Sequence, residues 1–236
     1  MLKRIREYFS VFEICLWLFS VTLILVSFFA FENDGCFTLF ASLLGVTALI
    51  FCAKGNPIGQ MLMVVFSLFY SIISLSFSYY GELVTYAGMT LPMAVFSLFS
   101  WIRNPHSKGK SEVRVNKVSK NDLTLLFSLA LIITAVFYFV LGFFNTANLI
   151  ISTLSVTTSF IAAFLTYKRS PFFALAYAIN DIVLITMWVY ASLTSTGYVS
   201  VVVCFFVFLM NDTYSFINWM RMQKRQRIKK QELSAS

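Results

Sequence analysis

Charged residues are scarce in this chain. Only 12% of its 236 residues are Asp, Glu, Lys or Arg, about half the share that a soluble domain carries. So few charges cannot cover a water-facing surface, which excludes an ordinary soluble protein. The apolar residues come in long unbroken runs rather than in alternation, which also excludes an outer-membrane barrel. The sequence therefore predicts an all-α polytopic membrane protein without a sizeable soluble domain.

Signatures of catalysis and metal binding are also missing. The chain has no Gly-rich phosphate loop, no HExxH and no Ser/His pair, and its single His, His106, lies in a polar linker. The four Cys, at 15, 36, 52 and 204, form no CxxC and are expected to be packing thiols. We therefore expect no enzyme, no metal and no cofactor. An ATP-driven pump within one chain is excluded, and a membrane enzyme using two Asp is disfavoured.

Eight apolar runs are long enough to cross ~30 Å of hydrocarbon as helices. They are 11–31, 36–53, 58–80, 83–102, 123–144, 148–167, 171–193 and 198–219.

The positions of the 18 Lys and Arg residues test this count. With eight spans, every one of them falls on the same side: in the N-terminal segment, at Lys54, in the linker after Ile102, at 168–169 and in the C-terminal tail. The positive-inside rule then places both termini in the cytoplasm. The net charge of +8 is thus a consequence of topology. The basic tail is expected to touch anionic lipid, and no nucleic-acid partner is expected.

Weak internal similarity predicts a repeat of three helices. The segment 42–47 resembles 152–157, Pro57 and Pro171 open the next helix, and the pair Ser100-Trp101 matches Asn218-Trp219. Four helices separate equivalent members, so the two copies are parallel, and transporters of this kind bind substrate between the copies. The predicted arrangement is 1+3+1+3: an N-terminal extra helix (1–35), a first repeat (36–102), a linker and connecting helix (103–147), a second repeat (148–219) and a basic tail (220–236).

Two polar pairs lie inside predicted spans, Asn180-Asp181 and Asn211-Asp212. A charged side chain at membrane depth costs ~2.5–3.5 kcal/mol on insertion scales and usually serves a pathway or relay. No Lys or Arg lies within a predicted span to pair with them. The alternative is that the two Asp only tie helices together by hydrogen bonds.

Helical spacing places more polar and aromatic groups on the same faces. Such a surface suits an aromatic, hydroxyl-bearing and cationic solute, because rings stack on Trp and Tyr and amides bind hydroxyls. Taken alone, Trp219 and Trp101 fit an interfacial aromatic belt better, because both end a predicted span beside an Arg. In the first copy Phe66 and Ser67 align with Asn180 and Asp181, so the site is expected to be asymmetric. The predicted substrate-binding residues are Tyr177, Asn180, Asp181, Trp188, Asn211, Asp212, Tyr214, Asn218 and Trp219.

In the stretches 176–188, 208–219 and 221–226, the sequence resembles the PnuC family of nicotinamide riboside transporters. The resemblance implies a fold like that of the SWEET sugar transporters and a homotrimer in a bacterial cytoplasmic (inner) membrane. It also implies facilitated diffusion of nicotinamide riboside, which cytoplasmic phosphorylation of the substrate makes one-way.

The chain departs from the WxxWxxN pattern of the family's riboside transporters. Ala174, Tyr177 and Asn180 stand at the three positions, so only the Asn matches. Relatives with altered patterns carry thiamine, riboflavin or nucleosides, and these substrates remain alternatives. Two further hypotheses are an ion-coupled transporter that uses Asp181 or Asp212, and a structural or signalling membrane protein.

Overall fold

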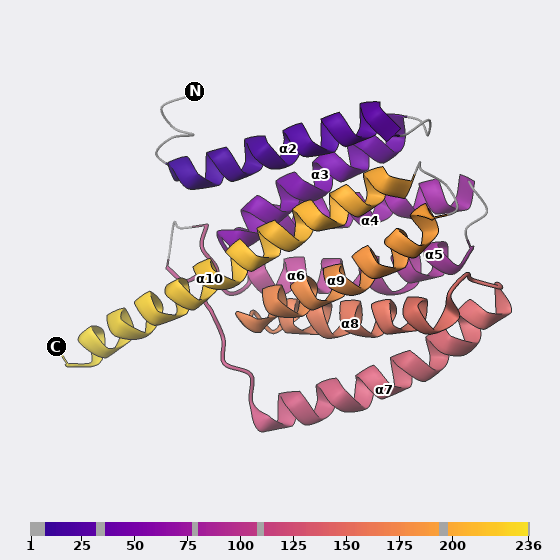
Figure 1. Cartoon of the computed structure of the whole chain (residues 1–236). Coiled ribbons are helices and arrows are strands. Elements are labelled where there is room, and N and C mark those ends of the chain that lie inside the picture. The colour runs from indigo at the N-terminus through magenta and orange to yellow at the C-terminus, as the bar shows by residue number, and fades with distance from the viewer. Residues whose placement is uncertain (1–7, 32–35, 77–79, 108–110, 194–197, 236) are drawn as a thin grey trace.

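The computed structural model describes residues 8–31, 36–76, 80–107, 111–193 and 198–235 (Figure 1). These residues form helices and one isolated β-bridge, Pro105 to Val113, and no strand lies among them. The all-helical prediction is confirmed. The helices are α2 (Val11–Phe31), α3 (Cys36–Ala53), α4 (Pro57–Ser76), α5 (Tyr80–Thr85), the π-helix η1 (Tyr86–Thr90), α6 (Leu91–Ile102), α7 (Lys120–Phe143), α8 (Leu149–Tyr167), α9 (Phe172–Ser192) and α10 (Val199–Ala235).

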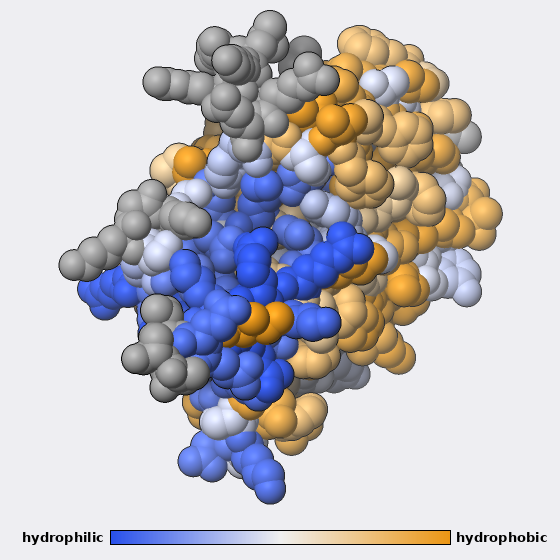
Figure 2. All heavy atoms as spheres, turned by 90° about the vertical axis from the view of Figure 1, so that its left-hand side faces the viewer, coloured by the Kyte–Doolittle hydropathy of each residue, from blue (hydrophilic) through white to orange (hydrophobic). Residues whose placement is uncertain are grey.

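Within the described ranges, seven helical segments are long and apolar enough to cross a membrane, with α5, η1 and α6 together forming one of them. The remaining predicted span, 36–53, corresponds to α3, which is apolar but shorter. Figure 2 looks onto the end of the bundle from which α10 projects, here called the basic end, where hydrophilic side chains gather while apolar ones cover the flanks. The chain is therefore a multi-pass membrane protein.

Two elements differ from the predicted spans. The span expected at 83–102 begins at Tyr80 and contains a turn of π-helix, which a pattern of apolar residues does not reveal. The last helix does not end at 219 but continues as far as Ala235, so the basic tail prolongs α10 beyond the bundle (Figure 1).

The helices pack so that the two halves of the chain interlock. The helix α10 contacts α9, α3 and α2, while α8 contacts α9, α7 and α6. The contacts of α10 with α3 and of α6 with α8 therefore join the N-terminal half to the C-terminal half. Within the first half α3 and α4 approach closely at Gly59, where a Cβ atom would lie 2.6 Å from the backbone nitrogen of Cys52.

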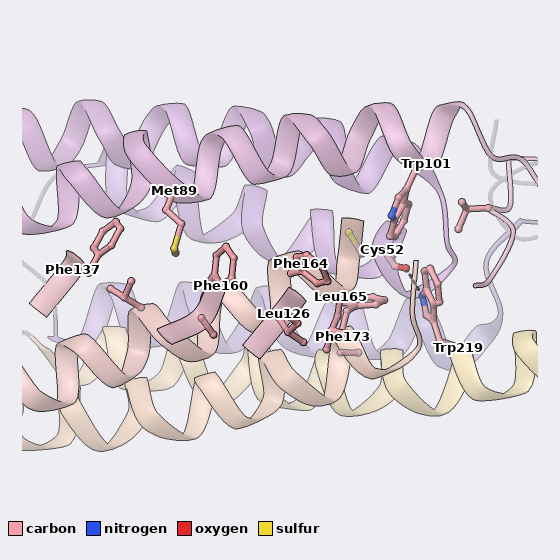
Figure 3. Packing of buried hydrophobic residues seen from close by; sticks show 14 of the residues in the cluster. Cys52, Met89, Trp101, Leu126, Phe137, Phe160, Phe164, Leu165, Phe173 and Trp219 are labelled. Carbon is pink, nitrogen blue, oxygen red and sulfur yellow. Dashed lines mark hydrogen bonds between the residues drawn. The ribbon is translucent and has the colours of Figure 1, made fainter. Parts of the chain in front are cut away.

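At the basic end each half holds the helix ends of the other. Trp101 at the end of α6 donates its indole N–H to the carbonyl oxygen of Thr166 at the end of α8, with an N···O distance of 2.9 Å. Trp219 on α10 donates in the same way to the carbonyl oxygen of Cys52 on α3, also at 2.9 Å. The two indole rings are in contact, with centroids 5.3 Å apart (Figure 3). Both rings are fully buried, so the alternative of an interfacial aromatic belt is wrong for them.

The neighbouring residues repeat this pattern. The Ser100 hydroxyl donates to the carbonyl oxygen of Tyr167 at 2.7 Å, and the Asn218 side chain donates to that of Ala53 at 2.8 Å. The last carbonyls of a helix have no partner within the helix. The carbonyls of Ala53 and Tyr167 gain a donor from Asn218 and Ser100, while those of Cys52 and Thr166 accept an indole N–H in addition to a backbone N–H of the following turn.

The turns after α3 and α8 are also alike. Gly55 and Arg169 both have positive φ angles, 64° and 56°. The linker that was expected to be a solvated segment is fastened to both turns: the Val113 N–H donates to the carbonyl of Gly55, and the Asn116 N–H donates to that of Arg169. The linker therefore connects the two halves across the basic end.

We predict that Trp101→Phe and Trp219→Phe each lower the free energy of unfolding by ~0.5–1.5 kcal/mol, because each removes a buried hydrogen bond to a helix-terminal carbonyl, which keeps only a backbone N–H of the following turn as its donor. The measurement is denaturant or thermal unfolding of the purified protein. Trp17→Phe is the matched control, because its indole donates only to the Thr47 hydroxyl, at 3.2 Å, on a half-buried side chain. An equal loss in all three variants would contradict the role given to the two buried indoles.

Candidate functional site

The side chains of Asp181 on α9 and Asp212 on α10 lie close to each other between these two neighbouring helices, near enough to interact electrostatically. Each residue is only 3% exposed. Asp181 lies ~14 Å along its helix from Phe172, which is about half of the hydrocarbon thickness. Two buried carboxylates repel each other, so the pair is stable only when it holds a proton or binds a cation.

Three further side chains surround this carboxyl pair. Tyr177 lies one turn before Asp181 on α9 and is close to both carboxyl groups. Cys52 on α3 lies beside Asp212, and Gln60 on α4 donates to the Cys52 sulfur at 3.2 Å. The pair therefore stands where helices of the two halves meet, with an aromatic ring and a thiol as neighbours.

The carboxyl pair has unused hydrogen-bonding capacity. Asp181 Oδ2 and Asp212 Oδ1 are buried, and neither has a hydrogen-bond partner among the described residues. The ion pairs formed by described residues all lie elsewhere, near the basic end: Lys54 with Glu13, Lys168 with Asp122 and Arg225 with Glu112. Buried polar atoms without partners are rare and call for an explanation. A cation or a hydrogen-bond donor from a ligand would supply one.

Asn180 is turned toward α8. Its side-chain amide is held by the hydroxyls of Thr158 and Ser159, at 2.8 and 3.1 Å from Oδ1. The Ser155 hydroxyl lies at 3.4 Å. The orientation of Asn180 is thus fixed by a row of small hydroxyl residues on α8, which the sequence pattern did not single out.

Asn211 and Tyr214 are turned toward the N-terminal helix α2. The Asn211 amide donates to the Ser20 hydroxyl at 3.0 Å, and the Tyr214 hydroxyl donates to Glu13 Oε1 at 2.8 Å. Glu13 also accepts from the ammonium group of Lys54 at 3.1 Å. These contacts fasten the extra helix to α10 and α3.

The remaining predicted residues lie at the two ends of the bundle. Asn218 and Trp219 bind the carbonyls that end α3. Trp188 contacts Tyr198 near the opposite end, with ring centroids 5.3 Å apart. Of the nine predicted residues, the structure thus brings Tyr177, Asp181 and Asp212 together in one place.

Sequence reasoning missed two carboxylates in the spanning helices, Glu13 and Glu82. Glu13 follows Ser10 by three residues, and the two form the reciprocal hydrogen bonds of a capping box. That spacing could have shown where α2 begins. Glu82 escaped because the span was expected to begin at residue 83, whereas α5 begins at Tyr80.

Comparison with known proteins indicates the family to which the chain belongs. The model of a family described as nicotinamide mononucleotide transporter matches residues 35–221. The chain belongs to this family. The match covers most of the chain and confirms the resemblance drawn from the sequence.

Two relatives of this transporter family are informative. The nicotinamide riboside transporter PnuC of Neisseria mucosa is 22% identical over 215 residues, which are 89% of this chain and 81% of the relative. A crystal structure described as that of the vitamin B3 transporter PnuC superposes with a TM-score of 0.77, over 92% of this chain and 94% of the other. At 20% identity this likeness shows the fold.

Proposed function

We propose that this protein is a facilitator for nicotinamide riboside, an aromatic cation that carries a ribose. The observation that carries this assignment is the carboxyl pair of Asp181 and Asp212, buried beside Tyr177 with one oxygen of each Asp unpartnered among the described residues. Membership of the transporter family and the name of the Neisseria relative support the substrate class.

The chemistry of the pair favours a cationic ring. A buried carboxylate is stable only when it is paired, hydrogen-bonded or neutralised. The positive charge of a pyridinium ring would compensate the ionised pair, and its face would lie against the Tyr177 ring. Asn180, held by α8 hydroxyls, would bind ribose or carboxamide groups in this arrangement. Trp188, Asn211, Tyr214, Asn218 and Trp219 would then act by holding the helices in place.

The alternative substrates differ from one another in their charge. Thiamine also carries a cationic ring and fits the same reasoning, whereas riboflavin and neutral nucleosides leave the pair uncompensated. An ion-coupled transporter is the second candidate, because two carboxyl groups in contact can hold a proton or bind sodium. Trapping by cytoplasmic phosphorylation belongs to the proposal, since a phosphorylated product would be repelled by the pair.

We further propose the 1+3+1+3 arrangement with two parallel repeats. The matched hydrogen bonds of Trp101 and Trp219 and the matched turns at Gly55 and Arg169 support it. In this arrangement each repeat contributes three spans, the connecting helix is α7, and the substrate lies between the repeats.

The proposed location is a bacterial inner membrane, with both termini cytoplasmic and a homotrimeric assembly, as the family resemblance implies. The gathering of hydrophilic side chains at the basic end supports this orientation (Figure 2). Highly exposed apolar side chains on α7, such as Leu131, Phe139 and Phe143, would face lipid or a neighbouring subunit.

The orientation is tested by cysteine accessibility in a cysteine-free background. Single cysteines at 34 and 196 should be labelled by an impermeant reagent from outside, and those at 108 and 232 only after the membrane is opened. Positions 34, 108 and 196 lie outside the described residues. A single position labelled from the wrong side would break the eight-span arrangement.

We expect nicotinamide mononucleotide to bind at least about tenfold more weakly than the riboside, because a phosphate needs Arg or Lys donors. No ion pair with Lys or Arg involves the described carboxyl pair. Calorimetry on the purified protein measures both ligands. Comparable affinities for the mononucleotide and the riboside would contradict the proposed site. Absence of riboside binding would contradict the proposed substrate.

Removal of charge at the pair separates binding from packing. Asp181→Asn and Asp212→Asn keep size and hydrogen-bonding capacity, so at least one of them should weaken riboside binding by ~1–3 kcal/mol, the range for hydrogen bonds to charged groups. The neutral reduced riboside should lose much less. Asp122→Asn is the control, because its carboxylate pairs with Lys168 near the basic end.

The same variants distinguish the competing hypotheses. If the pair only ties helices together, both variants bind and transport normally. If the pair carries a coupling ion, the variants bind substrate but lose gradient-driven uptake into liposomes. Equal losses for charged and neutral ligands in both variants would reject a direct charge contact.

A further inference from the structure

A second carboxylate, Glu82 on α5, lies among aromatic rings toward the end of the bundle opposite the basic end. The Ser74 hydroxyl on α4 donates to Glu82 Oε2 at 3.5 Å, and Glu82 is close enough to Tyr70 and Tyr86 to act on both electrostatically. We call Phe66, Tyr70, Ser74, Glu82 and Tyr86 the distal cluster. Nothing in the proposed function above uses these residues.

The aromatic members of the distal cluster are already stacked. The rings of Tyr70 and Tyr86 lie 4.8 Å apart at an interplanar angle of 27°. Phe66 contacts Tyr70 at 4.8 Å and Tyr86 at 6.3 Å. Tyr70, Glu82 and Tyr86 are only half-buried, although the Ser residues on the same face of α4 are buried. These three side chains are therefore less enclosed than the Ser residues beside them.

Local structure explains how the cluster is assembled. Tyr86 begins the π-helix η1, and such turns are frequent at functional sites because they shift the side chains that follow. On α4, the Ser67 and Ser71 hydroxyls bond only to carbonyls of their own helix, as packing residues do. Ser74 differs from them, because its hydroxyl is directed at the carboxylate of Glu82 on α5.

The cluster also lies near α10, the helix that carries Asp212. Cys204 on α10 lies close to Tyr70 and Tyr86, and Asp212 follows it on the same helix. The helical rise puts ~12 Å between these two positions along α10. The distal cluster and the Asp181–Asp212 pair are thus neighbours along one helix, one nearer the distal end and one nearer mid-depth.

A plainer explanation is that Glu82 simply stabilises the first turn of α5, where acidic residues are favoured. That accounts for an acidic residue near Tyr80, but any exposed orientation would serve it equally well. It does not account for a carboxylate that accepts from a buried hydroxyl of α4 and lies near two stacked tyrosines.

We propose that the distal cluster is a second binding station, at which Glu82 and the stacked rings of Tyr70 and Tyr86 hold the aromatic cation before it reaches the carboxyl pair. This inference rests on the proposed function for the direction of travel. The cluster offers a carboxylate and aromatic faces and includes no amide, so it recognises the charged ring and is indifferent to the ribose.

The test uses 1-methylnicotinamide, a pyridinium cation without ribose, with neutral nicotinamide as the matched ligand. Calorimetry or ligand-observed NMR on the purified full chain should show that the wild type binds the cation. Glu82→Gln should weaken that binding about fivefold or more, as expected for loss of a partly desolvated charge contact. Binding of nicotinamide should change less than about twofold.

Two further variants keep the result interpretable. Ser71→Ala is the control, because it removes a hydroxyl from the same face of α4 that bonds only within its helix. Tyr86→Leu removes one stacked ring and should weaken both ligands, which provides an independent check if Glu82→Gln does not fold. Thermal unfolding of each variant confirms that it is folded.

The inference is overturned if the wild type does not bind 1-methylnicotinamide, or if Glu82→Gln changes its affinity less than about twofold. It is also overturned if Asp181→Asn abolishes binding of this probe while Glu82→Gln does not. If the probe binds in a Glu82-dependent way but the riboside is not transported, the station stands and the proposed function fails. If the riboside is transported but probe binding does not depend on Glu82, the proposed function stands and the station fails.

Discussion

Hydrocarbon offers no hydrogen bonds, so every backbone group and charge within the membrane must find its partner inside the protein. The ends of α3 and α8 show how this chain meets that demand at the basic end. The last carbonyls of α3 accept from Trp219 and Asn218 of the C-terminal half. Those of α8 accept from Trp101 and Ser100 of the N-terminal half. Each half thus supplies hydrogen-bond donors to a helix end of the other half, and these bonds join the two halves at the basic end.

The carboxyl groups at depth follow the same constraint with different solutions. Glu13 is satisfied by Lys54, Tyr214 and the start of its own helix. Asp181 and Asp212 lie close to each other, no ion pair of the described residues includes them, and each keeps one buried oxygen without a hydrogen-bond partner among those residues. The protein thus provides Glu13 with a cation and with hydrogen-bond donors. It leaves one oxygen of each Asp in the pair without a partner among the described residues. That contrast within one chain separates a structural carboxylate from one that awaits a ligand.

The class of fold was predictable because it depends on properties that a sequence displays directly, namely apolar run length and the distribution of Lys and Arg. Asp181 and Asp212 could be selected because charge in an apolar run is conspicuous. Their direct contact could not be predicted, since it depends on the rotation of α9 against α10. The rotation of α10 also determines that Asn211 and Tyr214 face α2 and not the carboxyl pair. Glu82 was not selected because the predicted span began at residue 83, three residues after the helix begins. The π-helix that follows it could not be predicted, because a pattern of apolar residues does not distinguish it from an α-helix.

The crossed bonds at the basic end also bear on how often that end opens. Opening a path there by separating the halves breaks four side-chain hydrogen bonds together, because the two sets lie against each other through the Trp101 and Trp219 rings. At ~1 kcal/mol for each bond, the open form would be disfavoured by ~4 kcal/mol, or about a thousandfold. The resting protein would therefore be closed at this end almost all of the time.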